Sequence, residues 1–194
     1  MIPQSLLLNT RVFGSRDLLL RFLASRQDHW DLVAEVGVAF GGFSRLILDT
    51  LEPHQMHAFD LFGLHEMDWV FGSPPSSVMG NRTHLDYYHD QFPGVITYQG
   101  NSWERLAECA GDMFDFVYVD GAHDYDPVKK DIEQLKRVVQ SGGVIMFDDY
   151  TNYDVYGNEP FGVMQAVNEY IEEGHKVLGL SLNPGGFHNI AVEA

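Results

Sequence analysis

Three aspartates come directly after apolar stretches that have the character of buried strands. Asp120 follows residues 114–119, and the pair Asp148 and Asp149 follows residues 144–147. Three carboxylates that converge at one edge of a sheet would repel one another unless a cation lay between them. Oxygen ligands without sulfur suit a hard cation, so the pattern indicates a site for Mg²⁺ in preference to Ca²⁺ or Mn²⁺. The structural alternative is that these aspartates form turns and cap loops.

His123 lies three residues after Asp120, on the same expected loop. A neutral imidazole at this place could accept a proton from a substrate bound at the metal. A lone histidine on a loop is more often a solvated residue without chemistry. The neighbouring acidic cluster makes the catalytic interpretation about equally good.

A glycine-rich loop with Gly37, Gly41 and Gly42 follows another apolar stretch, residues 31–36. Glycines allow a tight turn between strand and helix and a close approach of the backbone to a ligand. The spacing differs from the G-x-G-x-x-G pattern of dinucleotide-binding proteins, so the loop alone is weak evidence for a cofactor. Any strand-to-helix crossover also needs a turn of this kind.

Asp60 makes the evidence for a cofactor more specific, because it lies at the end of the next expected strand, residues 55–59. A carboxylate at this position can accept hydrogen bonds from both hydroxyls of an adenosine ribose. Both NAD and S-adenosylmethionine carry such a ribose, and the missing third glycine favours S-adenosylmethionine. Asn101 and Ser102 follow the third expected strand, where they could bond an adenine edge or simply cap a helix.

The elements that must position these residues follow from the apolar periodicity. Helical spacing alternates with short apolar runs, which predicts an α/β fold: a Rossmann-like, doubly wound sheet with helices on both faces. The last two strands are joined by NPGG alone, so they should be antiparallel neighbours in an otherwise mostly parallel sheet. In such sheets ligands bind beyond the carboxyl ends of the strands. The expected strands are residues 31–36, 55–59, 95–98, 114–119, 144–147, 176–182 and 188–192, and the expected helices are residues 15–27, 42–51, 82–92, 102–109, 126 to the stop at Gly142-Gly143, and 161–173.

The chain length of 194 residues predicts one domain, residues 1–194. Within it, residues 61–94 form the odd stretch, which holds GSPPSS together with aromatic and histidine residues. We interpret this stretch as a variable lid or substrate segment, although aromatic residues more often serve packing.

The net charge of −16 argues against binding of nucleic acid or of an anionic membrane surface, since phosphate contacts need clustered Lys and Arg. No window approaches the roughly 20 apolar residues of a membrane span, and the start of the chain has no basic leader. The single cysteine, Cys109, excludes an internal disulfide framework. These features predict a cytoplasmic domain.

Five segments together resemble class I S-adenosylmethionine-dependent methyltransferases, and most of all the metal-dependent family that includes macrocin-type and mycinamicin-type sugar O-methyltransferases. The matching segments are EVGVAFGGFS at 35–44, HAFDLF at 57–62, GNS at 100–102, FVYVDGAHDYDPVKKDI at 116–132 and GGVIMFDDY at 142–150. The specific part is the VDGAH segment followed by GG-x4-DDY. The likeness covers residues 15–192.

The resemblance implies a seven-stranded sheet whose last strand is antiparallel. It also implies a Mg²⁺ ion at Asp120, Asp148 and Asp149, with His123 as the base and Asp120 beside it. Related catechol-type enzymes usually have a lysine at the position of His123, so the histidine favours the sugar-type branch. The implied cofactor-binding residues are Glu35, Gly37, Gly41, Ser44, Asp60, Asn101, Ser102 and Asp120.

The function expected from this resemblance is Mg²⁺-dependent transfer of a methyl group from S-adenosylmethionine to a hydroxyl of a small molecule. A sugar or polyol in a natural product is the expected acceptor, and a homo-oligomer is possible. Three alternatives stay open: a metal-independent methyltransferase acting on a phenol or an amine, an NAD-linked oxidoreductase, and a non-catalytic module that binds S-adenosylmethionine.

Overall fold

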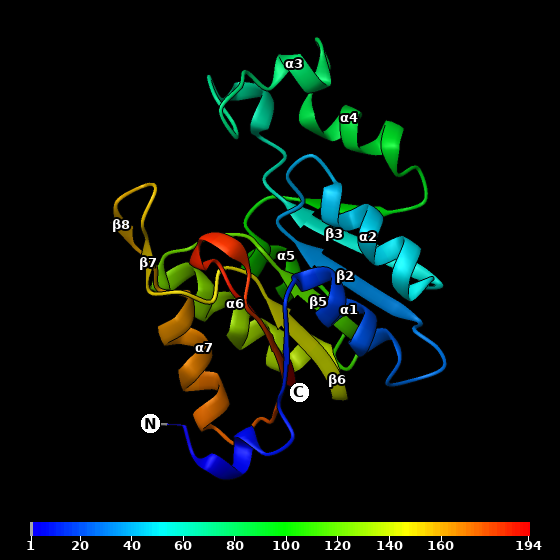
Figure 1. Cartoon of the computed structure of the whole chain (residues 1–194). Helices are drawn as coiled ribbons and strands as arrows, with labels where there is room; N and C mark the ends of the chain where they lie inside the picture. Colours follow the sequence, from blue (N-terminus) through cyan, green and yellow to red (C-terminus); the bar gives the residue numbers. More distant parts are fainter. Residues whose placement is uncertain (1) are drawn as a thin grey trace.

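The computed structural model describes residues 2–194, in which helices and strands alternate along the chain (Figure 1). The strands are β1 (Arg11–Phe13), β2 (Leu32–Val36), β3 (Gln55–Asp60), β4 (Ile96–Gln99), β5 (Phe114–Val119), β6 (Val139–Phe147), β7 (Tyr153–Asp154), β8 (Glu159–Pro160), β9 (Val177–Ser181) and β10 (Asn189–Glu193). The α-helices are α1 (Arg16–Ala24), α2 (Gly42–Leu51), α3 (Ser76–Met79), α4 (His84–Gln91), α5 (Ser102–Ala107), α6 (Tyr125–Val138) and α7 (Val163–Glu172), and the short 3₁₀ helices are η1 (Gln4–Leu7), η2 (Leu64–Glu66) and η3 (Pro184–Gly186).

The main sheet has eight strands in the order β1-β9-β10-β6-β5-β2-β3-β4. The predicted Rossmann-like, mostly parallel sheet is confirmed, and β10 is antiparallel to both β6 and β9. The predicted number of seven strands is wrong, because β1 adds an edge strand that pairs in parallel with β9. This strand of only three residues has no apolar alternation of its own, so only its tertiary pairing defines it.

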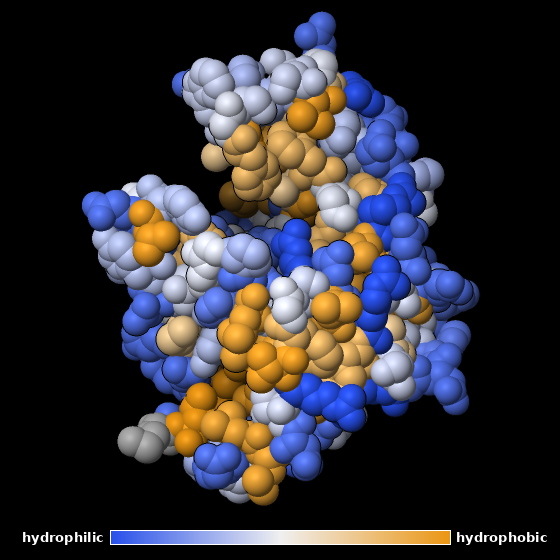
Figure 2. Space-filling model, in the orientation of Figure 1, coloured by the Kyte–Doolittle hydropathy of each residue, from blue (hydrophilic) through white to orange (hydrophobic). Residues whose placement is uncertain are grey.

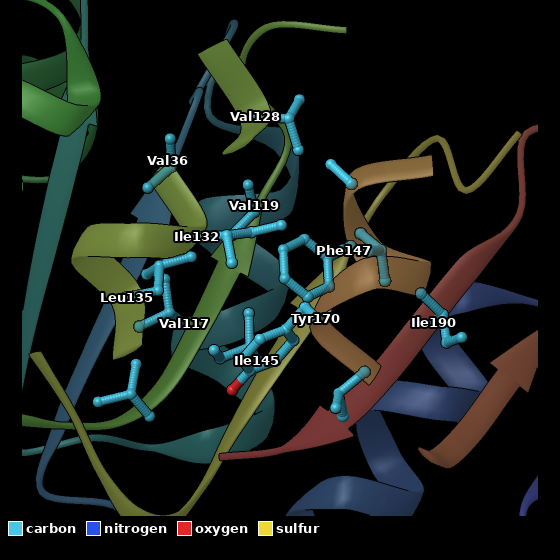
Figure 3. Packing of buried hydrophobic residues seen from close by; sticks show 14 of the residues in the cluster. Val36, Val117, Val119, Val128, Ile132, Leu135, Ile145, Phe147, Tyr170 and Ile190 are labelled. Atoms are coloured by element: carbon cyan, nitrogen blue, oxygen red, sulfur yellow. The ribbon is translucent and has the colours of Figure 1, made fainter. Parts of the chain in front are cut away.

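Two layers of helices cover the sheet. On one face, α1 and α2 pack on a cluster that includes Leu20, Ile47 and Phe116. On the other face, α6 and α7 pack on a second cluster, which Figure 3 shows with Ile132 and Phe147 near its centre. Strand β5 serves both layers, because its successive side chains point to opposite faces. Its nearly continuous apolar sequence is therefore explained by burial on both sides, as predicted.

The end of α6 differs from the sequence prediction. The helix ends at Val138, and β6 begins at once at Val139. Gly142 and Gly143, which were expected to stop the helix, lie inside β6. The pairing of β6 with β5 shifts register there, and Gly142 has a φ of 80°. The glycines therefore allow an irregularity within the strand rather than a helix end.

Residues 61–94 form a lobe above the carboxyl end of the sheet (Figure 1). A small core of its own attaches the lobe: Phe62, Tyr88 and Phe92 pack against Val38 and Ala58, which lie at the ends of β2 and β3. A second projection, the β7–β8 hairpin, was not predicted. Figure 2 shows a hollow between the lobe and this hairpin.

None of the helices within residues 2–194 has the length and apolar character that crossing a bilayer requires.

Candidate functional site

The predicted site residues gather where the strand order reverses. The chain passes from β2 outward through β3 to β4 and then returns to β5 on the other side of β2. The chain continues from β2 into α2 on one face of the sheet and from β5 into α6 on the other, so the two connections diverge beyond the first residues after the strands and form a crevice at the switch point. Gly37 and Asp120 are the first residues after these strands, and the Asp120 N–H donates to the Val36 carbonyl at 2.7 Å.

Two glycines of the first loop are required by their surroundings. Gly37 has a φ of 81°, and a Cβ there would lie 1.9 Å from the carbonyl oxygen of Asp120. Gly41 has a φ of 80°, and a Cβ there would lie 2.3 Å from the Phe92 ring. The loop thus passes directly against the next strand end and against the lobe, which only glycine permits.

Asp60 is held firmly at the end of β3. Its Oδ2 accepts the backbone N–H of Val38 at 2.8 Å, and its Oδ1 accepts that of Phe62 at 2.6 Å. These bonds join the carboxylate to the glycine loop on one side and to the lobe on the other. A carboxylate oxygen has a second lone pair, so Asp60 can still accept hydrogen bonds from a ribose at the crevice.

Glu35 does not face the crevice directly but lies buried beneath the glycine loop. The Ser44 hydroxyl donates to its carboxylate, and the Tyr88 hydroxyl donates to Ser44 at 3.0 Å. Burial, together with the nearby Asp60, raises the pKa of Glu35 from its ordinary value of 4.5 to about 8, although the Ser44 bond opposes the shift. Glu35 and Ser44 thus connect β2, α2 and the lobe.

The raised pKa of Glu35 makes stability depend on pH. In the folded protein Glu35 keeps its proton up to about pH 8, whereas in the unfolded chain it loses the proton near 4.5. Its contribution to the free energy of unfolding is therefore complete below pH 4.5 and is lost as pH rises toward 8. We expect Glu35→Gln to abolish this pH dependence. Between pH 5 and 8 the free energy of unfolding of the wild type should therefore fall by about 2–5 kcal/mol relative to that of the variant.

Urea unfolding of both proteins at pH 5 and pH 8 measures this difference. Glu52→Gln serves as the control, because Glu52 is an exposed residue at the end of α2. A parallel pH dependence for wild type and Glu35→Gln would contradict the buried, protonated state.

The segment GNS lies where the sequence placed it, at the start of α5. Asn101 is the N-cap residue, but its side chain donates to Glu104 at 3.2 Å rather than capping the helix. Ser102 bonds to Asp131 of α6, whose other oxygen is buried without a partner. Burial raises the pKa of Asp131 from 3.8 to about 6. Ser102 therefore contacts α6, whereas the Asn101 side chain is held by a contact within α5.

The second group of predicted residues converges beyond β5 and β6. Ligand atoms of Asp120, His123 and Asp149 all lie within 4.8 Å of one another. His123 Nε2 lies 3.0 Å from Asp149 Oδ2, and the imidazole stacks on Phe161 with ring centres 4.4 Å apart. Two carboxylates and an imidazole at this spacing fit a divalent cation, and the His–Asp pair is also the arrangement of an oriented general base.

Asp148, the third predicted metal ligand, lies outside this group. Its Oδ2 accepts hydrogen bonds from Arg16 at 3.0 Å and from the Tyr118 hydroxyl at 2.6 Å. Its Oδ1 accepts the side-chain amide of Asn189 at 2.5 Å and the backbone N–H of Asp149 at 2.8 Å. The last bond helps to hold Asp149 at a φ of 50°. As the structure stands, protein donors engage both oxygens of Asp148.

The electrostatics of the site follow from these contacts. Burial raises the pKa of Asp120 well above its usual range, and the carboxylates of Asp148 and Asp149 raise it further. Burial lowers the pKa of His123, but the hydrogen bond and charge of Asp149 outweigh this effect and leave the pKa above 6.5. The nearby Arg16 lowers the pKa of Asp120. The cluster therefore favours added positive charge, whether as a proton or as a cation.

Several contributors to the site were missed by sequence reasoning. Arg16 is a charged residue at the start of α1, with its guanidinium 4.9 Å from the Phe43 ring centre. His84 belongs to the stretch 61–94 that was interpreted as a lid or substrate segment. It is buried, and its Nε2 lies 2.6 Å from the Ala39 carbonyl oxygen of the glycine loop. Asn189 reaches the site from β10. No local pattern marks these residues, because each acts across a long separation in the chain.

The fold and the crevice together define the class: an α/β Rossmann-like fold with a glycine loop after β2 and an acid at the end of β3. The family model described as "Methyltransferase domain" matches residues 34–150, which is more than half of the chain. The chain belongs to this methyltransferase-domain family.

Solved structures with the same fold differ in the atom that they methylate. One is the N-methyltransferase NodS from Bradyrhizobium japonicum with S-adenosylhomocysteine (TM-score 0.61, 13% identity, 92% of this chain and 85% of that one). Another is an O-methyltransferase from Bacillus cereus, also with S-adenosylhomocysteine (TM-score 0.58, 14% identity, 92% of this chain and 78% of that one). A third is CalS11, a TDP-rhamnose 3'-O-methyltransferase of calicheamicin biosynthesis (TM-score 0.54, 18% identity, 91% of this chain and 78% of that one). At these identities the likeness shows the fold alone.

Among curated proteins, a 59-residue stretch is 37% identical to the uncharacterized protein R132 of Acanthamoeba polyphaga mimivirus. The match covers 30% of this chain and 25% of that protein. The matched stretch thus spans about a quarter of the length of this relative.

Proposed function

We propose that this protein transfers a methyl group from S-adenosylmethionine to a hydroxyl of a small molecule, a sugar or polyol group in a natural product. The observation that carries the proposal is the pairing of His123 with Asp149, 3.0 Å apart, at the same strand ends as the cofactor crevice. A hydroxyl needs a base to become a nucleophile. The net charge of −16 supports a small-molecule acceptor rather than nucleic acid or a membrane.

S-adenosylmethionine supplies an electrophilic methyl group on a sulfonium sulfur. Residues of the glycine loop, Asp60 and Asn101 would bind and orient the nucleoside end of this donor at the crevice. The new oxygen–carbon bond would form as the methyl–sulfur bond breaks, with S-adenosylhomocysteine as the leaving group. His123 would take the proton from the acceptor hydroxyl, and Asp149 would hold the ring and stabilise its charged form. Fixing the two reactants in this way supplies on the order of 7 kcal/mol or more of the lowered barrier.

We further propose that Asp120 and Asp149 hold a divalent cation, Mg²⁺ by their oxygen chemistry, with His123 at its side. The support is the geometry of the cluster, whose ligand atoms lie within 4.8 Å of one another, together with its charge: burial, and then the carboxylates of Asp148 and Asp149, raise the pKa of Asp120. A bound divalent ion lowers the pKa of a hydroxyl and fixes its direction. In this proposal Asp148 is a positioning residue that shapes the turn at Asp149.

A metal-independent methyltransferase is the second candidate, and one observation favours it. Arg16, 3.0 Å from Asp148, already brings a positive charge to the acidic cluster. The His123–Asp149 pair could then act alone as the base. The two candidates differ in their response to a chelator, which removes activity only where a metal is required.

Calorimetric titration with S-adenosylmethionine, with and without Mg²⁺, followed by mass analysis of hydroxylated acceptors, tests the proposal. We expect binding of the donor in both conditions and a gain of one methyl group only with Mg²⁺. Transfer that survives a chelator selects the metal-independent candidate. Methylation of amines but not of hydroxyl compounds would overturn the O-methylation proposal.

A further inference from the structure

A row of aromatic rings leads from the tip of the β7–β8 hairpin to His123. Tyr156 stacks on Phe187 with ring centres 5.9 Å apart, Phe187 lies 6.1 Å from Phe161, and Phe161 stacks on His123 at 4.4 Å. Tyr156 lies in the hairpin, Phe161 directly after β8, Phe187 in the β9–β10 connection and His123 in the loop after β5. Tyr156 is 76% exposed, whereas Phe161 is 8% exposed. The row therefore begins in solvent and ends at the proposed base.

The lobe on the other side of the hollow also exposes aromatic side chains. Phe71 of the lobe is 82% exposed, and its ring lies 6.1 Å from that of Phe40 in the glycine loop. Trp69, two residues before it, is 65% exposed. Figure 2 shows hydrophobic atoms on the underside of the lobe and on the hairpin, on either side of the hollow. Exposure of large aromatic side chains on both sides of a crevice is typical of a ligand groove.

The charges beside the row select against anions. Asp149 Oδ2 lies 3.0 Å from His123 Nε2 at the inner end of the row, and Glu159 lies in β8 of the hairpin. Asp154 stands at the base of the hairpin, where it accepts the Tyr156 backbone N–H at 2.7 Å. A phosphate or carboxylate on the part of the acceptor that lies along the hairpin would face Asp154 and Glu159, which is unfavourable.

We propose that the acceptor is an uncharged molecule in which a flat apolar group, such as an aromatic aglycone, adjoins the methylated hydroxyl and lies on Tyr156 and Phe187. This inference rests on the proposed O-methylation and narrows its substrate class: neither a free sugar nor a nucleotide sugar has such a neutral, apolar neighbour. The row supports a small acceptor rather than a second copy of the chain, because it runs into the reaction site instead of across the outer surface.

The test compares matched glycosides that differ only in the apolar group. Phenyl and methyl glycosides of the same sugar are titrated by calorimetry into the protein saturated with S-adenosylhomocysteine. We expect the phenyl glycoside to bind about tenfold more tightly, because burial and stacking of one ring contribute on that scale. Tyr156→Ala and Phe187→Ala should each remove most of this preference, and Tyr156→Phe should keep it.

Val155→Ala is the matched control, since Val155 is exposed on the same hairpin but lies outside the row. A phenyl phosphate titration tests the charge argument, and we expect no binding. Sedimentation of wild type and Tyr156→Ala tests the alternative occupant. A dimer that Tyr156→Ala dissociates would show that the row is a subunit interface and would overturn the proposal.

Equal affinity for the two glycosides, including no measurable binding of either, also overturns it. So does a preference that survives both alanine substitutions. These outcomes are separate from failure of the proposed function, which appears as an absence of methyl transfer to any hydroxyl compound while S-adenosylmethionine binds.

Discussion

Asp149→Ala should reduce methyl transfer by at least about a thousandfold and leave the affinity for S-adenosylmethionine nearly unchanged. The substitution removes both the partner of His123 at 3.0 Å and one carboxylate of the group formed with Asp120. Loss of an oriented base alone costs about 10²–10⁴ in rate, and loss of the cation site adds to it. Turnover of a methylated acceptor and calorimetric titration of the donor measure the two effects separately.

Asp126→Ala is the control for this experiment. Asp126 is exposed in the first turn of α6 and lies outside the cluster, so it should retain activity. If Asp149→Ala weakened donor binding as strongly as it weakened transfer, the proposal that one group of residues binds the donor and another acts on the acceptor would be wrong. Full activity of Asp149→Ala would remove Asp149 from the mechanism altogether.

Gly37→Ala should destabilise the protein by about 3 kcal/mol or more and abolish donor binding. The new Cβ would lie 1.9 Å from the Asp120 carbonyl oxygen, which is backbone and cannot rotate away. The φ of 81° adds strain for any residue with a Cβ. Relief of this overlap requires β2 and β5 to move apart at the switch point, where the crevice is built.

Chemical unfolding and calorimetry with S-adenosylmethionine check this prediction. Gly94→Ala is the comparison, because nothing lies within 4 Å of a Cβ there and its φ is not positive. We expect Gly94→Ala to change stability by less than about 1 kcal/mol. If Gly37→Ala kept the stability and the donor affinity of the wild type, Gly37 would not be in close contact with the Asp120 carbonyl oxygen.

The sequence alone determined most of the sheet and the location of the site. Apolar runs such as Phe114–Val119 must be buried on both faces, so helices on both sides of a mostly parallel sheet follow. Because parallel strands end at one edge, Asp60, Asp120 and Asp149 were expected at that edge, and the structure places them there. These inferences need only local periodicity and the geometry of parallel sheets.

Only the tertiary structure decided which groups meet. Whether the Asp148 carboxylate faces a cation or Arg16, Tyr118 and Asn189 depends on contacts between segments more than 29 residues apart in the chain. The strand β1 and the aromatic row to His123 likewise exist through pairing and packing across the chain. Such contacts leave no periodic trace in sequence, because a side chain's direction is set by the neighbours that folding brings to it.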